Sequence, residues 1–123
     1  MWPASVHSLS SAFDSSHPLG IDIDLFGREG APIAAACGGA VVFVPAATPC
    51  CSYGYYVEIS HGDGFSTLYA HLEKSPPPVA IGQIVAQGQT IGYGGTTGYS
   101  TGTHLHFEVR RGGAPVNPLG YLP

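Results

Sequence analysis

Short runs in which apolar and polar residues alternate, separated by turn residues, cover most of the chain. Alternation of this kind, in runs rich in β-branched and aromatic residues, is typical of strands that bury one face. After residue 20 the runs occupy residues 21–26, 32–44, 53–60, 65–72, 78–85, 89–95 and 103–111. No stretch repeats apolar residues at helical spacing over the length of an ordinary helix. The pattern therefore predicts an all-β fold, mainly an antiparallel sheet with hairpins and long loops.

The residues between the runs agree with this prediction. Asp63-Gly64 lies between residues 53–60 and residues 65–72, and Asp-Gly supplies the positive φ angles that a tight hairpin needs. These two runs are therefore expected to pair. Pro76-Pro77-Pro78 is predicted to form an exposed connection or an edge, because proline cannot donate a hydrogen bond within a sheet.

The length of the chain favours one domain. The 123 residues suffice for one core but not for a second domain of ordinary size. Residues 1–19 are rich in Ser, His and Pro and show little alternation, so residues 1–16 are expected to be an extended lead-in that wraps onto the rest. No linker or internal repeat interrupts the pattern. We predict a single domain over residues 1–123.

Charge excludes two classes of partner. The chain has 4 Lys+Arg against 8 Asp+Glu, a net charge of -4, and only 10% charged residues. Nucleic acids and anionic membranes bind basic surfaces, so neither is an expected partner. No apolar run is long enough to span a membrane, and the N-terminus lacks the basic start and apolar stretch of a signal peptide. We expect a monomer without membrane insertion, and a fragment of a longer protein.

The cysteines allow two interpretations. Cys37, Cys50 and Cys51 are odd in number, and their spacing matches neither a zinc ribbon nor a Cys-x-x-Cys redox pair. They are either small buried hydrophobic residues or contain one disulfide, from Cys37 to either of the adjacent cysteines, with one thiol left over. Such a bridge would fit an exported protein.

Several of the six histidines are placed as metal ligands would be. On a strand, alternation directs His104 and His106 to one face and the apolar residues between and after them to the other. Upstream, His17 precedes Asp22, which alternates with two isoleucines. A catalytic zinc site has three protein ligands and one open position, and two histidines with one aspartate fit that number. The helical His-Glu-x-x-His motif of common zincins is absent from the sequence, so a metallopeptidase here must be built from strands.

Four segments resemble the motifs of one family. They are His17 with Gly20-Ile21-Asp22, Leu68-Tyr69-Ala70-His71-Leu72, Gly82-Gln83 with Gly88-Gln89, and residues 97–108 (TGYSTGTHLHFE). In this order they are similar to the lysostaphin-type, LytM-like zinc endopeptidases that cut peptidoglycan, whose domain is a duplicated hybrid motif. The matches run from about residue 13 to residue 109.

The resemblance implies a role for five residues. It implies that His17, Asp22 and His106 hold one Zn²⁺ per chain and that His71 and His104 are the catalytic pair. One imidazole of the pair would accept a proton from the attacking water and the other would orient it or stabilise the oxyanion; either assignment is open.

This sequence departs from the family at one point. Four residues instead of three separate His17 from Asp22, and an irregular turn or bulge at Pro18 to Gly20 would absorb the extra residue. Asp24 shares the face of Asp22 and is the alternative carboxylate ligand.

Three further residues have simpler expected roles. Glu108 is expected to alternate off the histidine face, either in a salt bridge to an adjacent arginine or in support of a ligand. His61 is expected to be exposed or bonded within the hairpin turn. His7 has nothing around it that suggests a ligand.

Three functions are compatible with these observations. The resemblance implies an extracytoplasmic zinc endopeptidase that hydrolyses a peptide bond in the stem or cross-bridge of bacterial peptidoglycan. The alternative is a catalytically silent peptidoglycan-binding or hydrolase-activating domain of the same fold, and retention of the implied ligands and both catalytic histidines favours the enzyme. A lipoyl-like carrier, suggested by the paired Gly-Gln dipeptides, ranks last because Lys74 is the only lysine and lacks a hairpin setting.

Overall fold

The computed structural model describes residues 1–15, 17–44, 54–73, 78–96 and 103–123. Over these residues the chain is built from ten β-strands and one 3₁₀ turn, so the predicted all-β fold is confirmed. The elements are β1 (Leu9–Ser11), β2 (Ile21–Asp24), β3 (Pro32–Ala34), β4 (Gly39–Phe43), β5 (Tyr55–Gly62), β6 (Phe65–Leu72), β7 (Ile84–Val85), β8 (Thr90–Tyr93), β9 (His104–Arg111), β10 (Ala114–Val116) and η1 (Pro118–Gly120). No helix in the described ranges is long and apolar enough to cross a membrane.

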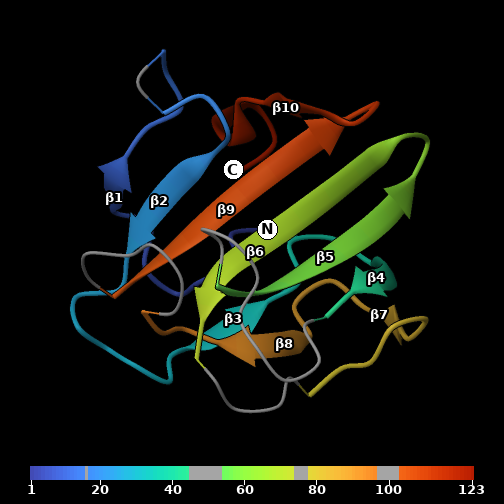
Figure 1. The fold of residues 1–123 in the computed structure, drawn as a ribbon, viewed down its shortest axis with the longest axis horizontal. Coiled ribbons are helices and arrows are strands. Elements are labelled where there is room, and N and C mark those ends of the chain that lie inside the picture. The colour runs from blue at the N-terminus through green and yellow to red at the C-terminus, as the bar shows by residue number, and fades with distance from the viewer. Residues whose placement is uncertain (16, 45–53, 74–77, 97–102) are drawn as a thin grey trace.

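Two antiparallel sheets contain these strands. The larger has eight strands in the order β1-β2-β9-β6-β5-β4-β7, with β10 paired to β9, and the smaller consists of β3 and β8. Figure 1 shows β2, β9, β6 and β5 side by side as the long central strands, with β3 and β8 at the end where β6 stops. Strand β9 pairs with both β2 and β6, and it is therefore an interior strand of the larger sheet.

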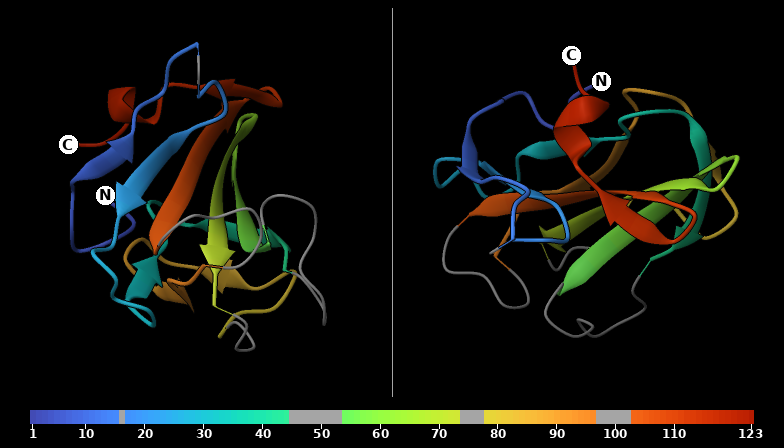
Figure 2. Two further views of the ribbon diagram at one scale, coloured as in Figure 1. Left: turned by 60° about the vertical axis from the view of Figure 1, so that its left-hand side comes forward. Right: turned by 90° about the horizontal axis from the view of Figure 1, so that it is seen from above.

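Alternation along the central strands separates an apolar face from a polar one. Ile21, Ile23, Leu105 and Phe107 are fully buried and belong to one core cluster, together with Ile33 and other residues of the smaller sheet and its flanks. The smaller sheet packs at one end of the larger one, as Figure 2 shows in two further views. The opposite face of β2 and β9 carries aspartate, histidine and glutamate, and it is free of the apolar core.

The predicted hairpin is confirmed. Strand β5 ends at Gly62 and β6 begins at Phe65, and the two residues between them, Asp63 and Gly64, have φ angles of 53° and 79°. Both angles lie in the left-handed region, which Asp and Gly tolerate better than most residues. The two long strands pair along their whole length, from Tyr55 with Leu72 to Gly62 with Phe65.

The single run predicted over residues 32–44 is divided between two sheets. Strand β3 pairs with β8, whereas β4 pairs with β5 and β7. The chain passes between the sheets at Gly38 and Gly39, and a Cβ at Gly39 would collide with the backbone oxygen of Ser60. Glycine permits this close crossing. The alternation pattern could not show the break, because both halves are apolar.

The lead-in and the cysteines also differ from expectation in part. Residues 9–11 of the lead-in form β1, which pairs with β2. Cys37 is exposed, so the interpretation of this residue as a buried hydrophobic one is wrong. The predicted partners Cys50 and Cys51, the connection at Pro76 and Pro77, and the residues 97–102 of the longest motif lie outside the described residues.

Candidate metal centre

The pairing of β2 with β9 places acidic and imidazole side chains next to each other. In the antiparallel register Asp22 lies opposite His106 and Asp24 lies opposite His104. Side chains directly opposite each other in an antiparallel pair project from the same face, with Cβ atoms about 5 Å apart. Because Ile21, Ile23, Leu105 and Phe107 occupy the core face, all four polar side chains belong to the outer face.

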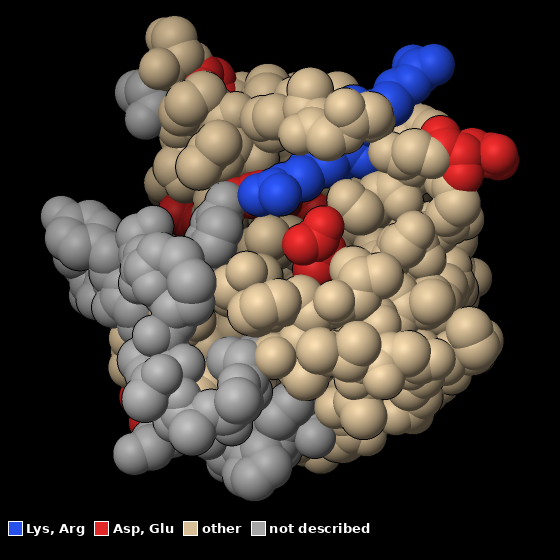
Figure 3. Space-filling view, turned by 45° about the vertical axis from the view of Figure 1, so that its right-hand side comes forward, with Lys and Arg blue, Asp and Glu red and all other residues tan. Residues whose placement is uncertain are grey.

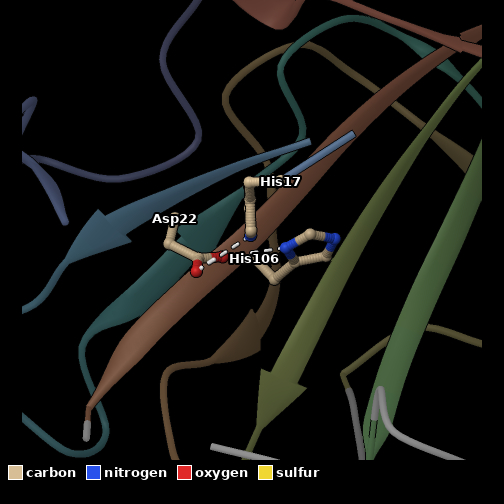
Figure 4. Close-up of side chains that lie close together, drawn as sticks. All are labelled: His17, Asp22 and His106. Carbon is tan, nitrogen blue, oxygen red and sulfur yellow. Dashed lines mark hydrogen bonds and ion pairs between the residues drawn. The ribbon is translucent and has the colours of Figure 1, made fainter. Parts of the chain in front are cut away.

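His17 reaches the same place from the segment that precedes β2. Its Nε2 lies 3.2 Å from Asp22 Oδ2, and His106 Nδ1 lies 2.8 Å from Asp22 Oδ1. Figure 4 shows dashed lines from the carboxylate of Asp22 to both rings. His17, Asp22 and His106 each offer one ligand atom, and these atoms lie within 4.8 Å of one another. The structure therefore brings together the three residues that the resemblance implied as ligands.

The extra residue between His17 and Asp22 lies before the strand. Pro18 to Gly20 lie outside β2, and Leu19 is 45% exposed. Gly20 is required at the strand entry, because a Cβ there would collide with the backbone oxygen of Phe107 and contact the side chain of Glu108. The additional residue is absorbed in this irregular segment, and β2 keeps its register with β9.

The hydrogen bonds of the two histidines fix which nitrogen faces Asp22. His17 Nδ1 lies 2.6 Å from the backbone oxygen of Gly20, which can only accept, so Nδ1 carries the hydrogen. His106 Nε2 donates to Glu108 Oε2 at 2.8 Å. The remaining nitrogens, Nε2 of His17 and Nδ1 of His106, both face the carboxylate of Asp22. Ligating histidines commonly donate their second N–H to a carbonyl or carboxylate in this manner. The donor set and its outer bonds therefore fit a zinc ion.

Burial and charge alter the acidity of the cluster in the metal-free protein. For Asp22, burial alone would raise the pKa, but the hydrogen bond from His106 and the nearby charges of His104, His106 and His17 lower it below 3.8. For His106, burial alone would lower the pKa, but hydrogen bonds to Asp22 and Glu108 and their negative charges raise it to about 9. Two carboxylates thus favour a cation at His106, and a proton and a divalent metal ion compete for that position.

His104 and His71 lie beside this cluster. The ring of His71 lies 4.9 Å from that of His104 and 6.1 Å from that of His106, measured between centroids. His104 Nε2 is 3.7 Å from Asp22 Oδ2. His71 follows Ala70, which pairs with His106, so regular alternation would place its side chain on the core face. A φ angle of 61° interrupts β6 at His71, and its ring instead contacts the histidines of the outer face.

Asp24 has a different partner from Asp22. Its Oδ1 accepts a hydrogen bond of 2.7 Å from the backbone N–H of Phe26, whose φ angle is 53°. An aspartate side chain that accepts from the backbone two residues later stabilises a turn. Asp24 therefore closes the turn after β2, and the described His, Cys, Asp and Glu side chains that group as ligands include Asp22 in its place.

The expected position of Glu108 is wrong. Residues 104, 106 and 108 have the same parity on β9, so Glu108 shares the face of the histidines, and it is fully buried. Its Oε2 accepts from His106, and its Oε1 lies 2.7 Å from Arg110 Nη2. The salt bridge and the contact with a candidate ligand, which the sequence offered as alternatives, are both present. Counting residues along the strand would have found this contact.

Two histidines lie elsewhere. His61 belongs to β5, where its Nδ1 bonds to the backbone oxygen of Gly38 at 2.7 Å and its Nε2 to Thr67 Oγ1 at 2.8 Å. It is therefore bonded across the sheet and not within the turn. His7 stacks on Trp2, with ring centroids 4.3 Å apart.

An open groove of about 530 Å³ adjoins the cluster. Its lining comes from β1, β2, the turn after β2 and the start of β9. Its described lining consists of Ser10, Ser11, Asp22, Asp24, Gly27, Thr103 and His104. All of these residues except Gly27 have polar side chains that can hydrogen-bond, as recognition of an extended peptide requires.

Comparison with known proteins now identifies the family. Residues 18–118 match the model of peptidase family M23. The chain belongs to peptidase family M23. The resemblance to lysostaphin-type enzymes is thereby confirmed, and lysostaphin from Staphylococcus simulans has the same fold, with a TM-score of 0.80, 26% identity, and coverage of 99% of this chain and 53% of that one.

Other known proteins are similar over nearly the whole chain. A zinc-containing peptidase from Vibrio cholerae superposes with a TM-score of 0.82 at 32% identity, over 94% of this chain and 37% of that one. The lipoprotein NlpD/LppB homolog of Pseudomonas aeruginosa is 42% identical, and the murein hydrolase activator NlpD of Escherichia coli is 38% identical; each alignment covers 99% of this chain. The chain spans 39% and 31% of the lengths of these two relatives.

Proposed function

We propose that this M23 chain is a zinc-dependent endopeptidase that hydrolyses a peptide bond in the stem or cross-bridge of bacterial peptidoglycan, outside the cytoplasm. One observation carries the proposal: His17 and His106 each donate one ring N–H to a fixed acceptor and face Asp22 with the other nitrogen. This arrangement supports ligation, because a neutral imidazole nitrogen must be available to the metal. Family membership and the similarity to a zinc-containing peptidase add support.

In this proposal His17, Asp22 and His106 hold one Zn²⁺ per chain. When bound, zinc supplies a Lewis acid that makes water more acidic and polarises a carbonyl group. Two imidazoles and one carboxylate leave a tetrahedral ion one open position. The groove lined by Asp22 and His104 adjoins these ligands, so a peptide bound in it would lie beside the proposed site.

The protein's own contribution to the chemistry would come from His71 and His104. Their rings lie in edge contact, and His104 also lies near the carboxylate of Asp22. A neutral imidazole beside the proposed metal ligands can accept the proton of the attacking water. The neighbouring imidazole can donate a hydrogen bond to the oxyanion that forms at the scissile carbonyl. The serine and threonine side chains of the groove would hold the substrate backbone.

The test uses purified protein and purified peptidoglycan. Metal analysis should find about one zinc per chain, and released fragments should be identified by mass, which also shows which bond is cut. Removal of zinc by a chelator should abolish release, and added zinc should restore it. His61→Ala is the matched control, because it removes an imidazole from the other face of the sheet. A folded wild type that binds no zinc and releases no fragments would disprove the proposal.

A second function is supported by the names of several relatives. The E. coli relative is named a murein hydrolase activator, so this chain could stimulate a separate hydrolase without cutting peptidoglycan. The two functions are separated by adding a purified murein hydrolase to the same assay. Stimulation that persists in His104→Ala, with no fragments released by the chain alone, would establish the activator function.

A further inference from the structure

Glu108 links the candidate metal centre to the protein surface. Its two carboxylate oxygens have different partners: Oε2 accepts from His106 Nε2 at 2.8 Å, and Oε1 accepts from Arg110 Nε at 2.9 Å and lies 2.7 Å from Arg110 Nη2. The side chain of Glu108 is fully buried, whereas that of Arg110 is 26% exposed. A continuous series of hydrogen bonds therefore runs from Asp22 through His106 and Glu108 to Arg110.

Arg110 supplies the positive charge that this buried carboxylate needs. An ionised carboxylate removed from water is costly unless it is paired and hydrogen-bonded. Two nitrogens of the planar guanidinium, Nε and Nη2, converge on the single oxygen Oε1, so Arg110 holds one oxygen of the carboxylate while the other bonds to His106. The chain has only 4 Lys+Arg residues, and few charged side chains lie on the face shown in Figure 3, where basic and acidic groups are neighbours.

Arg111, the residue after Arg110, lies on the other side of β9 and provides an internal control. Arg111 follows Arg110 on β9 and alternates to the other side, where its guanidinium carbon lies 5.7 Å from the ring centre of Phe65. The two arginines thus have the same charge and adjacent positions on one strand. They differ in their partners, because Arg110 pairs with Glu108 and Arg111 lies over Phe65.

We propose that Arg110 is a positioning residue for the metal centre: it fixes Glu108, which holds the His106 ring with Nδ1 directed at the zinc position beside Asp22. The inference rests on the proposed function, because it concerns the same zinc site. Arg110 is not among the three candidate ligands and would act through two other side chains, Glu108 and His106. Outer partners of ligating histidines commonly contribute 10- to 100-fold to metal affinity, so we expect a loss of about tenfold or more when Arg110 is neutralised.

The experiment compares Arg110→Gln with Arg111→Gln in the otherwise intact chain. Zinc affinity is measured by competition with a chromophoric chelator, and circular dichroism verifies the fold. Arg110→Gln should bind zinc about tenfold more weakly or worse, and Arg111→Gln should bind within about twofold of wild type. Arg110→Lys, which keeps the charge but loses the paired Nε and Nη2 contacts with Oε1, should lie between them and is the variant to use if Arg110→Gln does not fold.

A second measurement reports on the ring itself. In the zinc-loaded protein, ¹⁵N NMR of the His106 side chain should show a protonated Nε2 in the wild type, and that signal should shift or broaden in Arg110→Gln but not in Arg111→Gln. Equal zinc affinities in the two Gln variants, with unchanged His106 signals, would overturn the inference and leave the proposed function intact. Zinc binding by the wild type without release of peptidoglycan fragments would overturn the proposed function and leave the inference intact.

Discussion

The two faces of the larger sheet each hold a histidine by two hydrogen bonds, but the two sets of partners differ in charge. On the outer face, His106 lies between the carboxylates of Asp22 and Glu108, at 2.8 Å from each. On the core face, His61 lies between a backbone carbonyl and the hydroxyl of Thr67, which continues to the hydroxyl of Tyr69 at 2.7 Å. One histidine has two anions as partners, and the other has two neutral groups.

This difference separates a reactive site from a structural one. Two anions favour a cation between them, and the pKa of His106 is raised to about 9 although burial alone would lower it. On the core face, hydrogen bonds instead join His61 to Thr67 and Thr67 to Tyr69. The hydroxyl of Tyr69 also accepts from the buried backbone N–H of Ala36. Burial raises the pKa of Tyr69 to about 12, so this hydroxyl keeps its proton. Substitutions on the outer face should therefore change chemistry, and those on the core face should change stability.

The largest expected effect of a substitution is that of His104→Ala on peptide hydrolysis. The loss of a general acid or base should lower turnover by about 10²- to 10⁴-fold while zinc remains bound. Release of peptidoglycan fragments and zinc content are measured on the same sample. His61→Ala should retain turnover within about threefold, since removing a histidine from the core face leaves the catalytic chemistry in place. Full turnover in His104→Ala would remove that residue from the mechanism.

The pH dependence of stability should differ between the metal-free and zinc-loaded protein. The folded pKa of His106 lies above its ordinary value of 6.5, so its contribution is complete below pH 6.5 and is lost as the pH rises through about 9. The loss amounts to about 3 kcal/mol. Because the pKa of Asp22 is lowered, its contribution is present above pH 3.8 and is lost as the pH falls below that value.

Denaturant unfolding at a series of pH values measures this effect. With zinc bound the loss above pH 6.5 should disappear, because the metal replaces the proton and binds better as the pH rises. His61→Gln should keep the profile of the metal-free wild type. A metal-free protein whose unfolding free energy is constant between pH 6 and 9 would contradict the assigned charge of His106.

Gly20→Ala should destabilise the protein by about 2–3 kcal/mol, since the added methyl group must displace the backbone of Phe107 or the side chain of Glu108. It should also weaken zinc binding, because the backbone oxygen of Gly20 orients His17. Gly120→Ala is the matched control, as nothing lies within 4 Å of the added Cβ and its φ is not positive. Thermal melts of the two variants measure the difference, and equal melting temperatures would refute the close approach.

Tyr69→Phe should have the smallest effect and act on stability alone. It leaves the N–H of Ala36 without its partner, and an unsatisfied buried donor costs about 1–2 kcal/mol. Urea unfolding measures the loss, and zinc affinity should be unchanged. A weaker zinc affinity in Tyr69→Phe would show that the two faces of the sheet are coupled.

Much of the fold could be predicted from alternation and turn chemistry. Asp63-Gly64 specified the hairpin, and the isoleucines of β2 and the apolar residues of β9 specified which side chains face the core. Alternation also placed His104 and His106 together. The division of residues 32–44 between two sheets could not be predicted, because it depends on how closely Gly39 approaches Ser60 of another strand.

The site was predictable in part. Asp22 and Asp24 have the same parity, so alternation could not distinguish them, and the turn at Phe26 that binds Asp24 depends on backbone geometry. His71 has the wrong parity for the outer face, and only its positive φ brings it there. Its assignment came from family resemblance. The role of Glu108 was accessible to simple counting along the strand and was missed.

The position of Asp22 opposite His106 also has a consequence for folding. The two residues are 84 positions apart in the chain and meet only when β2 pairs with β9, a late and slow kind of event because a long loop must close first. An unfolded chain therefore has no preformed zinc site. In the proposed enzyme, zinc would bind after the strands have paired and would not direct folding. It would then raise the free energy of unfolding by about 2.7 kcal/mol when its free concentration is a hundred times the Kd.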